Sequence, residues 1–191
     1  ETMSDLYEVK AGVLAAKENS DLPVFVSMTY EKSGRTLSGC DPETMVAVLE
    51  GLGVDALGIN CSLGPDELYD IMEQVLSHAH VPVLMQPNAG LPHLEDGHTC
   101  YAMDDASFAE KTVPYVIMGV SVVGGCCGTT PQGISILRNL LPKECIRRQN
   151  PYRTCVTSGV KSVSFDQGIV ICGERLNPTG KKKLKQALLE E

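Results

Sequence analysis

The stretch Val120-Ser121-Val122-Val123-Gly124-Gly125-Cys126-Cys127-Gly128-Thr129-Thr130-Pro131 joins an apolar run to a glycine-rich turn with two adjacent cysteines, and then to a helix start. It predicts a strand over residues 116–123 and a helix over residues 130–140, because threonine caps helices and proline suits their first turn. Neighbouring side chains of a regular strand point to opposite faces, so both cysteines can reach one site only where the backbone leaves strand geometry. The flanking glycines permit that departure, since they adopt positive φ at little cost.

The same unit, an apolar strand followed by an amphipathic helix, repeats along the chain. The pattern predicts strands over residues 23–29, 56–61, 81–86 and 116–123, and helices over residues 4–17, 41–52, 65–76, 105–112 and 130–140. Residues 87–103 are rich in turn formers and are expected to be irregular, with His93 and His98 as surface histidines. This alternation indicates an α/β fold of parallel βα units, in which helices cover an inner sheet or barrel.

Composition limits the classes of function. The chain has 191 residues, 43% of them apolar, which is enough for a sizeable core. A net charge of -8 argues against nucleic acid and anionic membranes as partners. No signal peptide precedes the first helix-like segment and no apolar run approaches the ~20 residues of a membrane span, so a cytoplasmic protein is expected.

The eight cysteines are expected to be reduced thiols, because the chain lacks the features of a secreted disulfide scaffold. Five of them show no ligand-like spacing and are interpreted as packing or surface thiols. These are Cys40, Cys100, Cys145, Cys155 and Cys172.

Cys61, Cys126 and Cys127 are predicted to form a metal site. Cys61 ends the apolar run of residues 56–61, and Asn88 follows the next predicted strand. The carboxyl ends of parallel strands meet at one edge, so these side chains are expected to converge. Three thiolates suit zinc and leave a fourth position open, as in catalytic sites. The alternatives are an ordinary buried thiol beside a tight turn, or a redox pair, which the absence of a Cys-x-x-Cys spacing disfavours.

Three thiolate ligands would also decide what such a zinc site can do. They offset the charge of Zn²⁺, so the metal should be a poor Lewis acid toward water and should prefer a soft ligand. A substrate thiol would bind as a thiolate at neutral pH and stay nucleophilic. The predicted task is activation of a thiol for attack on an electrophilic carbon.

The residues Gly58-Ile59-Asn60-Cys61 and Gly124-Gly125-Cys126-Cys127-Gly128-Thr129 together resemble the zinc signature of the homocysteine S-methyltransferases, and the similarity extends over residues 1–142. The resemblance implies a (β/α)₈ barrel in which Cys61, Cys126 and Cys127 bind zinc and the homocysteine sulfur is the fourth ligand. It implies no catalytic residue beyond the zinc site. Contacts with the substrate or beside the metal are implied for four residues. They are Glu1, Ser27, Thr29 and Asn88. By the resemblance, Glu1 ends the fourth barrel strand and holds the substrate ammonium.

Residues 171–182 resemble the opening of the pterin-binding domain of cobalamin-dependent methionine synthases, with Glu174 and Asn177 at pterin-contacting positions. This resemblance implies that homocysteine takes its methyl group from methylcobalamin, bound by a domain outside this chain and recharged by 5-methyltetrahydrofolate. The alternatives are a homocysteine S-methyltransferase that uses betaine or S-methylmethionine, and a structural zinc module without catalysis.

The expected organisation is the second half of a homocysteine-binding barrel over residues 1–142, a linker over 143–168 and the start of a pterin-binding domain over 169–191, beginning with a strand at 169–172. Only four predicted barrel strands precede residue 142, so the chain is expected to be a fragment with open sheet edges. Open edges favour aggregation or pairing with another chain, and marginal stability and incomplete activity are expected.

Overall fold

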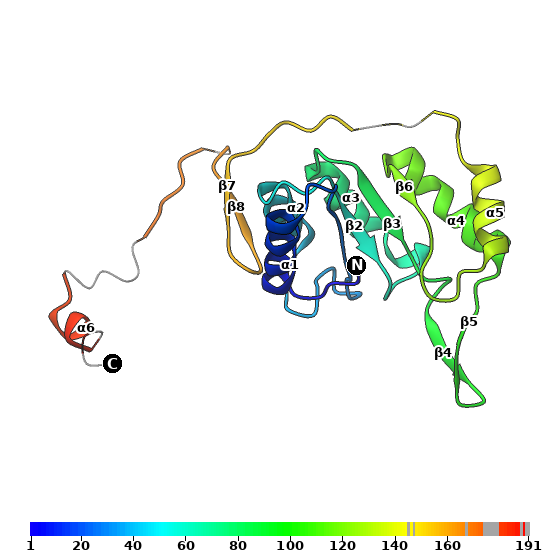
Figure 1. Ribbon diagram of the computed structural model, residues 1–191, viewed down its shortest axis with the longest axis horizontal. Helices are drawn as coiled ribbons and strands as arrows, with labels where there is room; N and C mark the ends of the chain where they lie inside the picture. The colour runs from blue at the N-terminus through cyan, green and yellow to red at the C-terminus, as the bar shows by residue number, and fades with distance from the viewer. Residues whose placement is uncertain (145, 147, 167, 174–179, 188, 190–191) are drawn as a thin grey trace.

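A parallel sheet of four strands, in the order β1-β2-β3-β6, forms the centre of the computed structural model (Figure 1). The structure describes residues 1–191 except 145, 147, 167, 174–179, 188 and 190–191. The strands are β1 (Phe25–Met28), β2 (Ala56–Asn60), β3 (Val83–Gln86) and β6 (Val122–Val123). Each strand lies beside the next parallel strand along the chain, which is the order of an α/β barrel and differs from that of a doubly wound sheet. The described strands form an open sheet.

The N-terminal residues extend this sheet beyond β1. Met3 forms a parallel bridge with Met28, its N–H donates to the Ser27 carbonyl at 3.1 Å, and its own carbonyl accepts from the Thr29 N–H at 2.8 Å. Residues 1–3 therefore occupy the position of one more strand at the β1 edge.

Helices connect the strands of the sheet. They are α1 (Leu6–Asn19), α2 (Pro42–Gly51), the short 3₁₀ helix η1 (Pro65–Glu67), α3 (Tyr69–His78), α4 (Asp105–Met118) and α5 (Pro131–Leu140). The Asp41 side chain accepts from the Thr44 N–H at the start of α2, and the Thr130 hydroxyl accepts from the Gly133 N–H at the start of α5. These caps satisfy N–H groups that have no partner within the helix.

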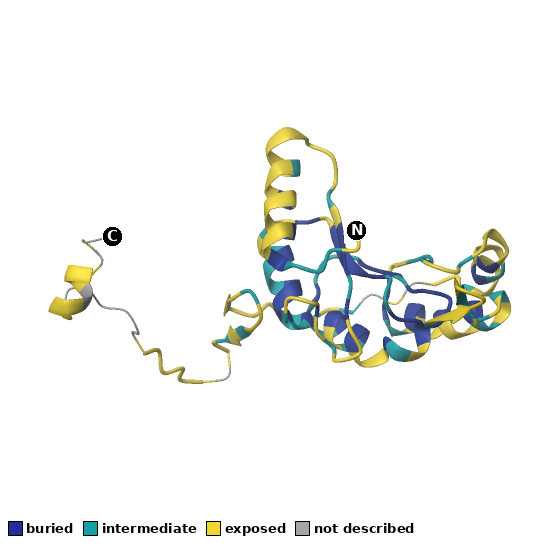
Figure 2. Ribbon diagram, turned by 90° about the horizontal axis from the view of Figure 1, so that it is seen from below, coloured by how far each residue is buried: buried dark blue, intermediate teal, exposed yellow. Residues whose placement is uncertain are grey.

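The main core lies on the face of β2 and β3 that α2 and α3 cover. Every residue of β2 is buried, and Figure 2 shows the buried strands between partly exposed helices. Leu57, Ile59 and Met85 pack with the inner faces of α2 and α3, while Phe108 and Leu137 join α4 to α5 in a second cluster. The α/β class is therefore confirmed, and the buried strands explain the continuous apolar runs in the sequence.

The expected strand over residues 116–123 is wrong in its first half. Helix α4 continues past the predicted end at 112 to Met118, with Pro114 inside it, and only Val122–Val123 pair as β6. Tyr115 and Val116 continue the buried helical face that starts at Phe108. Gly119, at φ 123°, then ends the helix by donating its N–H to the carbonyls of Tyr115 and Val116.

Two further segments differ from expectation because they form hairpins. Within residues 87–103, β4 (Pro92–Glu95) and β5 (His98–Tyr101) pair across the turn Asp96-Gly97, where both residues have positive φ. This turn is typical of two-residue hairpins. His93 and His98 lie on this hairpin and are exposed, as expected. Within the expected linker, β7 (Cys155–Thr157) and β8 (Ser162–Ser164) form a second hairpin beside α2.

The strand expected at 169–172 is also wrong, because residues 169–173 form neither helix nor strand. Ile169 and Ile171 are 98% and 93% exposed, so the apolar run has no surface to pack against. The chain then reaches α6 (Lys182–Ala187), away from the sheet (Figure 1). None of the helices in the described ranges is long and apolar enough to cross a membrane.

Candidate metal centre

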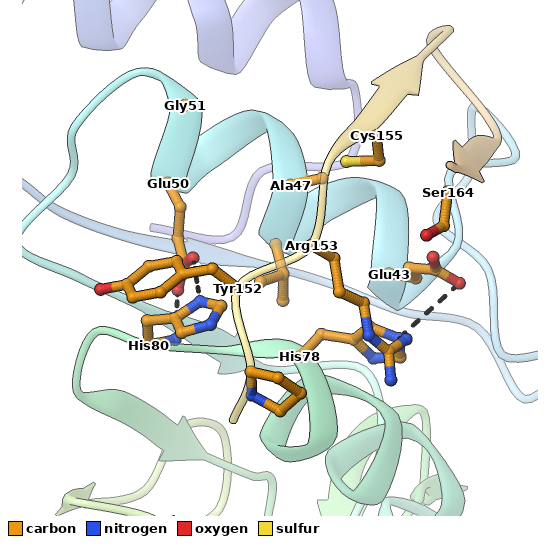
Figure 3. Close-up of a pocket in the computed structure, with 12 residues that line it drawn as sticks. Glu43, Ala47, Glu50, Gly51, His78, His80, Tyr152, Arg153, Cys155 and Ser164 are labelled. Carbon is orange, nitrogen blue, oxygen red and sulfur yellow. Dashed lines mark hydrogen bonds and ion pairs between the residues drawn. The ribbon is translucent and has the colours of Figure 1, made fainter. Parts of the chain in front are cut away.

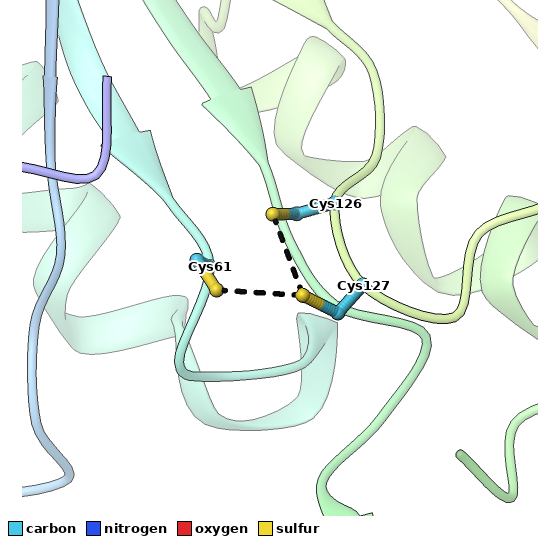
Figure 4. A group of neighbouring side chains, drawn as sticks. All are labelled: Cys61, Cys126 and Cys127. Atoms are coloured by element: carbon cyan, nitrogen blue, oxygen red, sulfur yellow. Dashed lines mark hydrogen bonds between the residues drawn. The ribbon is translucent and has the colours of Figure 1, made fainter. Parts of the chain in front are cut away.

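Three cysteine sulfurs converge at the carboxyl edge of the parallel sheet (Figure 4). The Sγ atoms of Cys61 and Cys127 are 3.7 Å apart, and those of Cys126 and Cys127 are 3.9 Å apart. All three sulfurs lie within 4.8 Å of one another. Cys61 follows β2, whereas the other two follow β6, so the cluster joins segments 65 residues apart or more in the chain.

The end of β3, which lies between β2 and β6, holds both cysteine segments in place. The Cys61 N–H donates to the Gln86 carbonyl at 3.0 Å, and the Cys126 N–H donates to the Pro87 carbonyl at 2.8 Å. The Cys127 N–H donates to Oδ1 of Asn88 at 3.1 Å. Because each cysteine backbone is hydrogen-bonded to this one segment, the three sulfurs are positioned by the end of a buried strand.

The backbone leaves strand geometry at the cysteines, as the sequence indicates. Cys61 and Ser62 have φ of 63° and 60°, a left-handed conformation that is uncommon outside glycine. Gly128 has φ of 79°, and a Cβ there would lie 2.6 Å from Cβ and Cγ of Tyr101. The turn thus needs glycine both for its conformation and for the close approach of the tyrosine.

The sulfur spacing fits a zinc ion. Tetrahedral Zn–S bonds of about 2.3 Å place sulfur atoms about 3.8 Å apart, close to the two separations found. Cys127 is exposed and Cys61 and Cys126 are half-buried, so an ion held by all three keeps one side open to a ligand from solvent. An all-thiolate donor set also suits zinc better than magnesium or calcium.

The electrostatic environment differs between the adjacent cysteines. The pKa of Cys127 is lowered, first by a hydrogen bond from the Tyr101 side chain. Burial, with the neighbouring Cys61, raises the pKa of Cys126 to about 11. Burial raises the pKa of Tyr101 itself, so its hydroxyl stays protonated and can donate. Of the two adjacent cysteines, Cys127 is therefore the more ready to bind a metal as thiolate.

The expected substrate-contacting residues lie around this edge at different depths. Ser27 and Asn88 are buried, Thr29 is half-buried beside Met3, and Glu1 is exposed at the chain start. Among the described residues, neither Thr29 nor Glu1 has a side-chain hydrogen bond to the sulfurs. The expected pterin contacts, Glu174 and Asn177, lie outside the described residues.

Two residues that the sequence analysis did not single out approach the sulfurs. Asn60 Nδ2 lies 4.0 Å from Sγ of Cys126, and the Tyr101 side chain hydrogen-bonds Cys127. Asn60 could have been noticed because it is a polar residue at the end of an otherwise apolar strand, directly before Cys61. Tyr101 carries no such signal, because the hairpin that brings it to the turn was expected to be irregular.

A cavity of about 310 Å³ lies away from the cysteines, between α2, the end of α3 and the segment that carries β7 (Figure 3). Tyr152 stacks on His80 with ring centres 4.1 Å apart, and His80 Nδ1 lies 2.8 Å from a Glu50 carboxylate oxygen. Arg153 and Glu43 both lie near His78, at 3.1 Å and 3.8 Å. These contacts attach residues 150–155 to the outer face of the fold.

Comparison with known proteins finds relatives along the whole chain. The family model of homocysteine S-methyltransferase matches residues 1–141. The methionine synthases of Mycobacterium tuberculosis and Mycobacterium leprae are each 34% identical to the whole of this chain, which spans 17% of their length.

Solved structures of the homocysteine methyltransferase MmuM from Escherichia coli share the fold. The apo form has a TM-score of 0.55 at 24% identity and covers 73% of this chain and 48% of its own. The metallated form has a TM-score of 0.58 at 23% identity and covers 71% of this chain and 42% of its own. This likeness places the open sheet in the (β/α)₈ barrel class. With the family match over residues 1–141, it follows that the chain belongs to the homocysteine S-methyltransferase family.

Proposed function

We propose that this chain is the part of a cobalamin-dependent methionine synthase in which the homocysteine sulfur accepts a methyl group. The observation that carries the proposal is the convergence of Cys61, Cys126 and Cys127, at zinc-like spacing, on the edge of the sheet where barrel enzymes place their chemistry. The family match and the similarity to methionine synthases along the whole chain support the same reaction class.

In this proposal the three cysteines hold a zinc ion through their thiolates. Zinc, when bound, supplies a position that takes the substrate sulfur as a thiolate at neutral pH and leaves it nucleophilic among the other sulfurs. The chain's own part is to hold the cysteines. The β3 end fixes their backbones, Tyr101 donates to Cys127, and the exposed side of Cys127 leaves room for the substrate.

Substrate recognition is assigned to the segments beside the sulfurs. Glu1, whose carboxylate can pair with the homocysteine ammonium, belongs to the N-terminal segment that lies along β1. Ser27 and Thr29 lie on and just after β1, at the same carboxyl edge. Asn88 supports the Cys127 backbone from the third strand.

The methyl donor in this proposal is methylcobalamin, held by another domain of the longer protein and recharged from 5-methyltetrahydrofolate. Homocysteine would lose its thiol proton on binding, and the new S–CH₃ bond would form as the cobalt–carbon bond of the donor breaks and leaves its electron pair on cobalt, so that methionine is the product. The same proposal divides the chain into three parts. These are a homocysteine-binding domain over 1–142, a linker over 143–168 and the start of a pterin-binding domain over 169–191. Glu174 and Asn177 would contact the pterin.

The length of chain that resembles methionine synthases favours methylcobalamin as the donor over betaine or S-methylmethionine. The family model ends at residue 141, but the similarity to methionine synthases continues through residue 191. The chain spans 17% of those relatives, so the donor is a property to be tested on the longer protein.

X-ray absorption at the zinc edge tests the proposed role of the site. A catalytic site should gain one sulfur ligand when homocysteine is added to the zinc-loaded chain, whereas serine, which has the same amino acid backbone without sulfur, should change nothing. An unchanged sulfur count with homocysteine would point to a structural zinc module. Turnover of the longer protein with methylcobalamin, betaine and S-methylmethionine would then identify the donor.

A further inference from the structure

Asn60 is a buried amide at the carboxyl end of β2, between the cysteine cluster and the N-terminal segment. Its side chain is 2% exposed. Oδ1 accepts hydrogen bonds from the Thr2 N–H and from the Ser27 hydroxyl, both at 2.8 Å. Nδ2 donates to the Thr2 hydroxyl at 2.6 Å and lies 4.0 Å from Sγ of Cys126. One side chain thus contacts three separate segments of the site.

These contacts use the full hydrogen-bonding capacity of an amide. An asparagine offers two lone pairs on oxygen and two hydrogens on nitrogen, and all four have partners here. The orientation of the amide is also fixed, because a backbone N–H such as that of Thr2 can only donate and must face the oxygen. Neither aspartate nor a smaller residue could make the same set of contacts.

The conformation of Thr2 shows that the contact holds the N-terminal segment in place. Thr2 has φ of 59°, which is uncommon for any residue with a Cβ and rarer still for a β-branched one. Strained conformations persist where their surroundings hold them, and Thr2 is held by two hydrogen bonds to Asn60. The backbone from which Glu1 projects is therefore set by a residue next to Cys61.

We propose that Asn60 is a positioning residue, which fixes the N-terminal segment and Ser27 relative to the sulfurs so that homocysteine is held by its ammonium and its sulfur together. The inference rests on the proposed homocysteine activity. Asn60 holds no metal and touches no reacting atom. Its loss should therefore weaken homocysteine binding much more than zinc binding, since all three cysteines remain.

Homocysteine titration of the zinc-loaded chain by calorimetry tests this role, with zinc affinity measured separately against a chromophoric chelator. Asn60→Ala should weaken homocysteine binding about tenfold or more, the effect of losing one to two hydrogen bonds, with zinc affinity within about threefold of the wild type. Asn150→Ala is the matched control, because Asn150 also donates to two partners, the carbonyls of Leu76 and Ala79, but on the outer face. It should bind homocysteine as the wild type does.

A spectroscopic signature separates positioning from a general loss of structure. In the cobalt-substituted chain, removal of the Asn60 donor should move the thiolate-to-metal charge-transfer band to lower energy, because a hydrogen bond stabilises the sulfur lone pair. Thr2→Val keeps the side-chain shape and removes only the Oγ1 partner of Asn60. It should weaken homocysteine binding without moving the band, and the double variant should bind no more weakly than Asn60→Ala.

The outcomes distinguish this inference from the proposed function. A wild-type chain that binds zinc but shows no affinity for homocysteine would overturn both. Homocysteine binding by Asn60→Ala within twofold of the wild type, or an unmoved band, would overturn the role of Asn60 alone. If Asn60→Ala does not fold, Thr2→Val becomes the deciding variant, because Thr2 is exposed and its substitution should not prevent folding. A wild-type homocysteine affinity in Thr2→Val would contradict the inference.

Discussion

The backbone N–H of Cys127 donates a 3.1 Å hydrogen bond to Oδ1 of Asn88, so the exposed cysteine of the cluster is held by a side chain that is 2% exposed. Asn88 follows β3, whose end also accepts hydrogen bonds from Cys61 and Cys126. The spacing of the three sulfurs is therefore a property of the core strand between them and does not depend on the cysteine loops alone.

Asn88→Ala should loosen Cys127 and lower zinc affinity. Residues that orient metal ligands typically contribute about 10- to 100-fold in affinity, and this range is expected here. Asn88→Asp retains an oxygen acceptor for the Cys127 N–H and should lie closer to the wild type. Competition with a chromophoric chelator measures both, and wild-type affinity in Asn88→Ala would show that the β3 contact does not position the sulfur.

Gly128→Ala should destabilise the fold by about 1–3 kcal/mol, because it adds a Cβ at positive φ and in contact with Tyr101. Gly97→Ala is the matched control: Gly97 has φ of 78°, but a Cβ there meets no atom within 4 Å. The control should lose only the conformational part of that free energy. Urea unfolding of both variants measures the difference, and equal losses would mean that the Tyr101 contact adds nothing.

Glu73→Gln should lower stability near neutral pH and have a smaller effect in acid. Arg148 donates two hydrogen bonds to the Glu73 carboxylate, at 3.0 and 2.8 Å, and lowers its pKa. A carboxyl whose pKa is lower in the folded state contributes stability above its unfolded pKa of about 4.3, and loses that contribution as pH falls through the folded value. The pair is partly exposed, so about 0.5–1 kcal/mol is expected at pH 7.

Unfolding of wild type and Glu73→Gln at pH 7 and at about pH 3 checks this prediction, since the pair should contribute little at the lower pH. Glu18→Gln, at an exposed glutamate of α1, is the control and should show little difference at either pH. A penalty for Glu73→Gln that is the same at both pH values would mean that the charge of Glu73 does not stabilise the fold.

The sequence predicts those features that depend on local signals. The caps Asp41 and Thr130 lie where helices α2 and α5 begin, because their side chains bond to nearby backbone N–H groups. Cys61 and the Cys126-Cys127 pair could be brought together from sequence because strand ends of a parallel sheet share an edge. Their chemistry followed from residue type, and the spacing of the sulfurs is what zinc would require.

The features that the sequence did not reveal depend on contacts between distant segments. The hydrogen bonds of Asn60 join it to Thr2, 58 positions away in the chain. The residues next to Thr2 and Asn60 in the sequence give no sign of this contact. The end of α4 was misplaced because the apolar residues from 116 onward were assigned to a strand, whereas the buried face through Tyr115 and Val116 carries the helix to Met118. The apolar residues at 169–172 resemble a strand but have no strand beside them.

Zinc stoichiometry tests the central claim, that Cys61, Cys126 and Cys127 hold a metal. The purified chain, Cys127→Ser and Cys172→Ser would each be loaded with zinc and dialysed, and their metal content measured; Cys172 is an exposed thiol outside the cluster. One zinc per chain is expected in the wild type and in Cys172→Ser, with loss in Cys127→Ser. Zinc content in Cys127→Ser equal to that of the wild type would contradict the account.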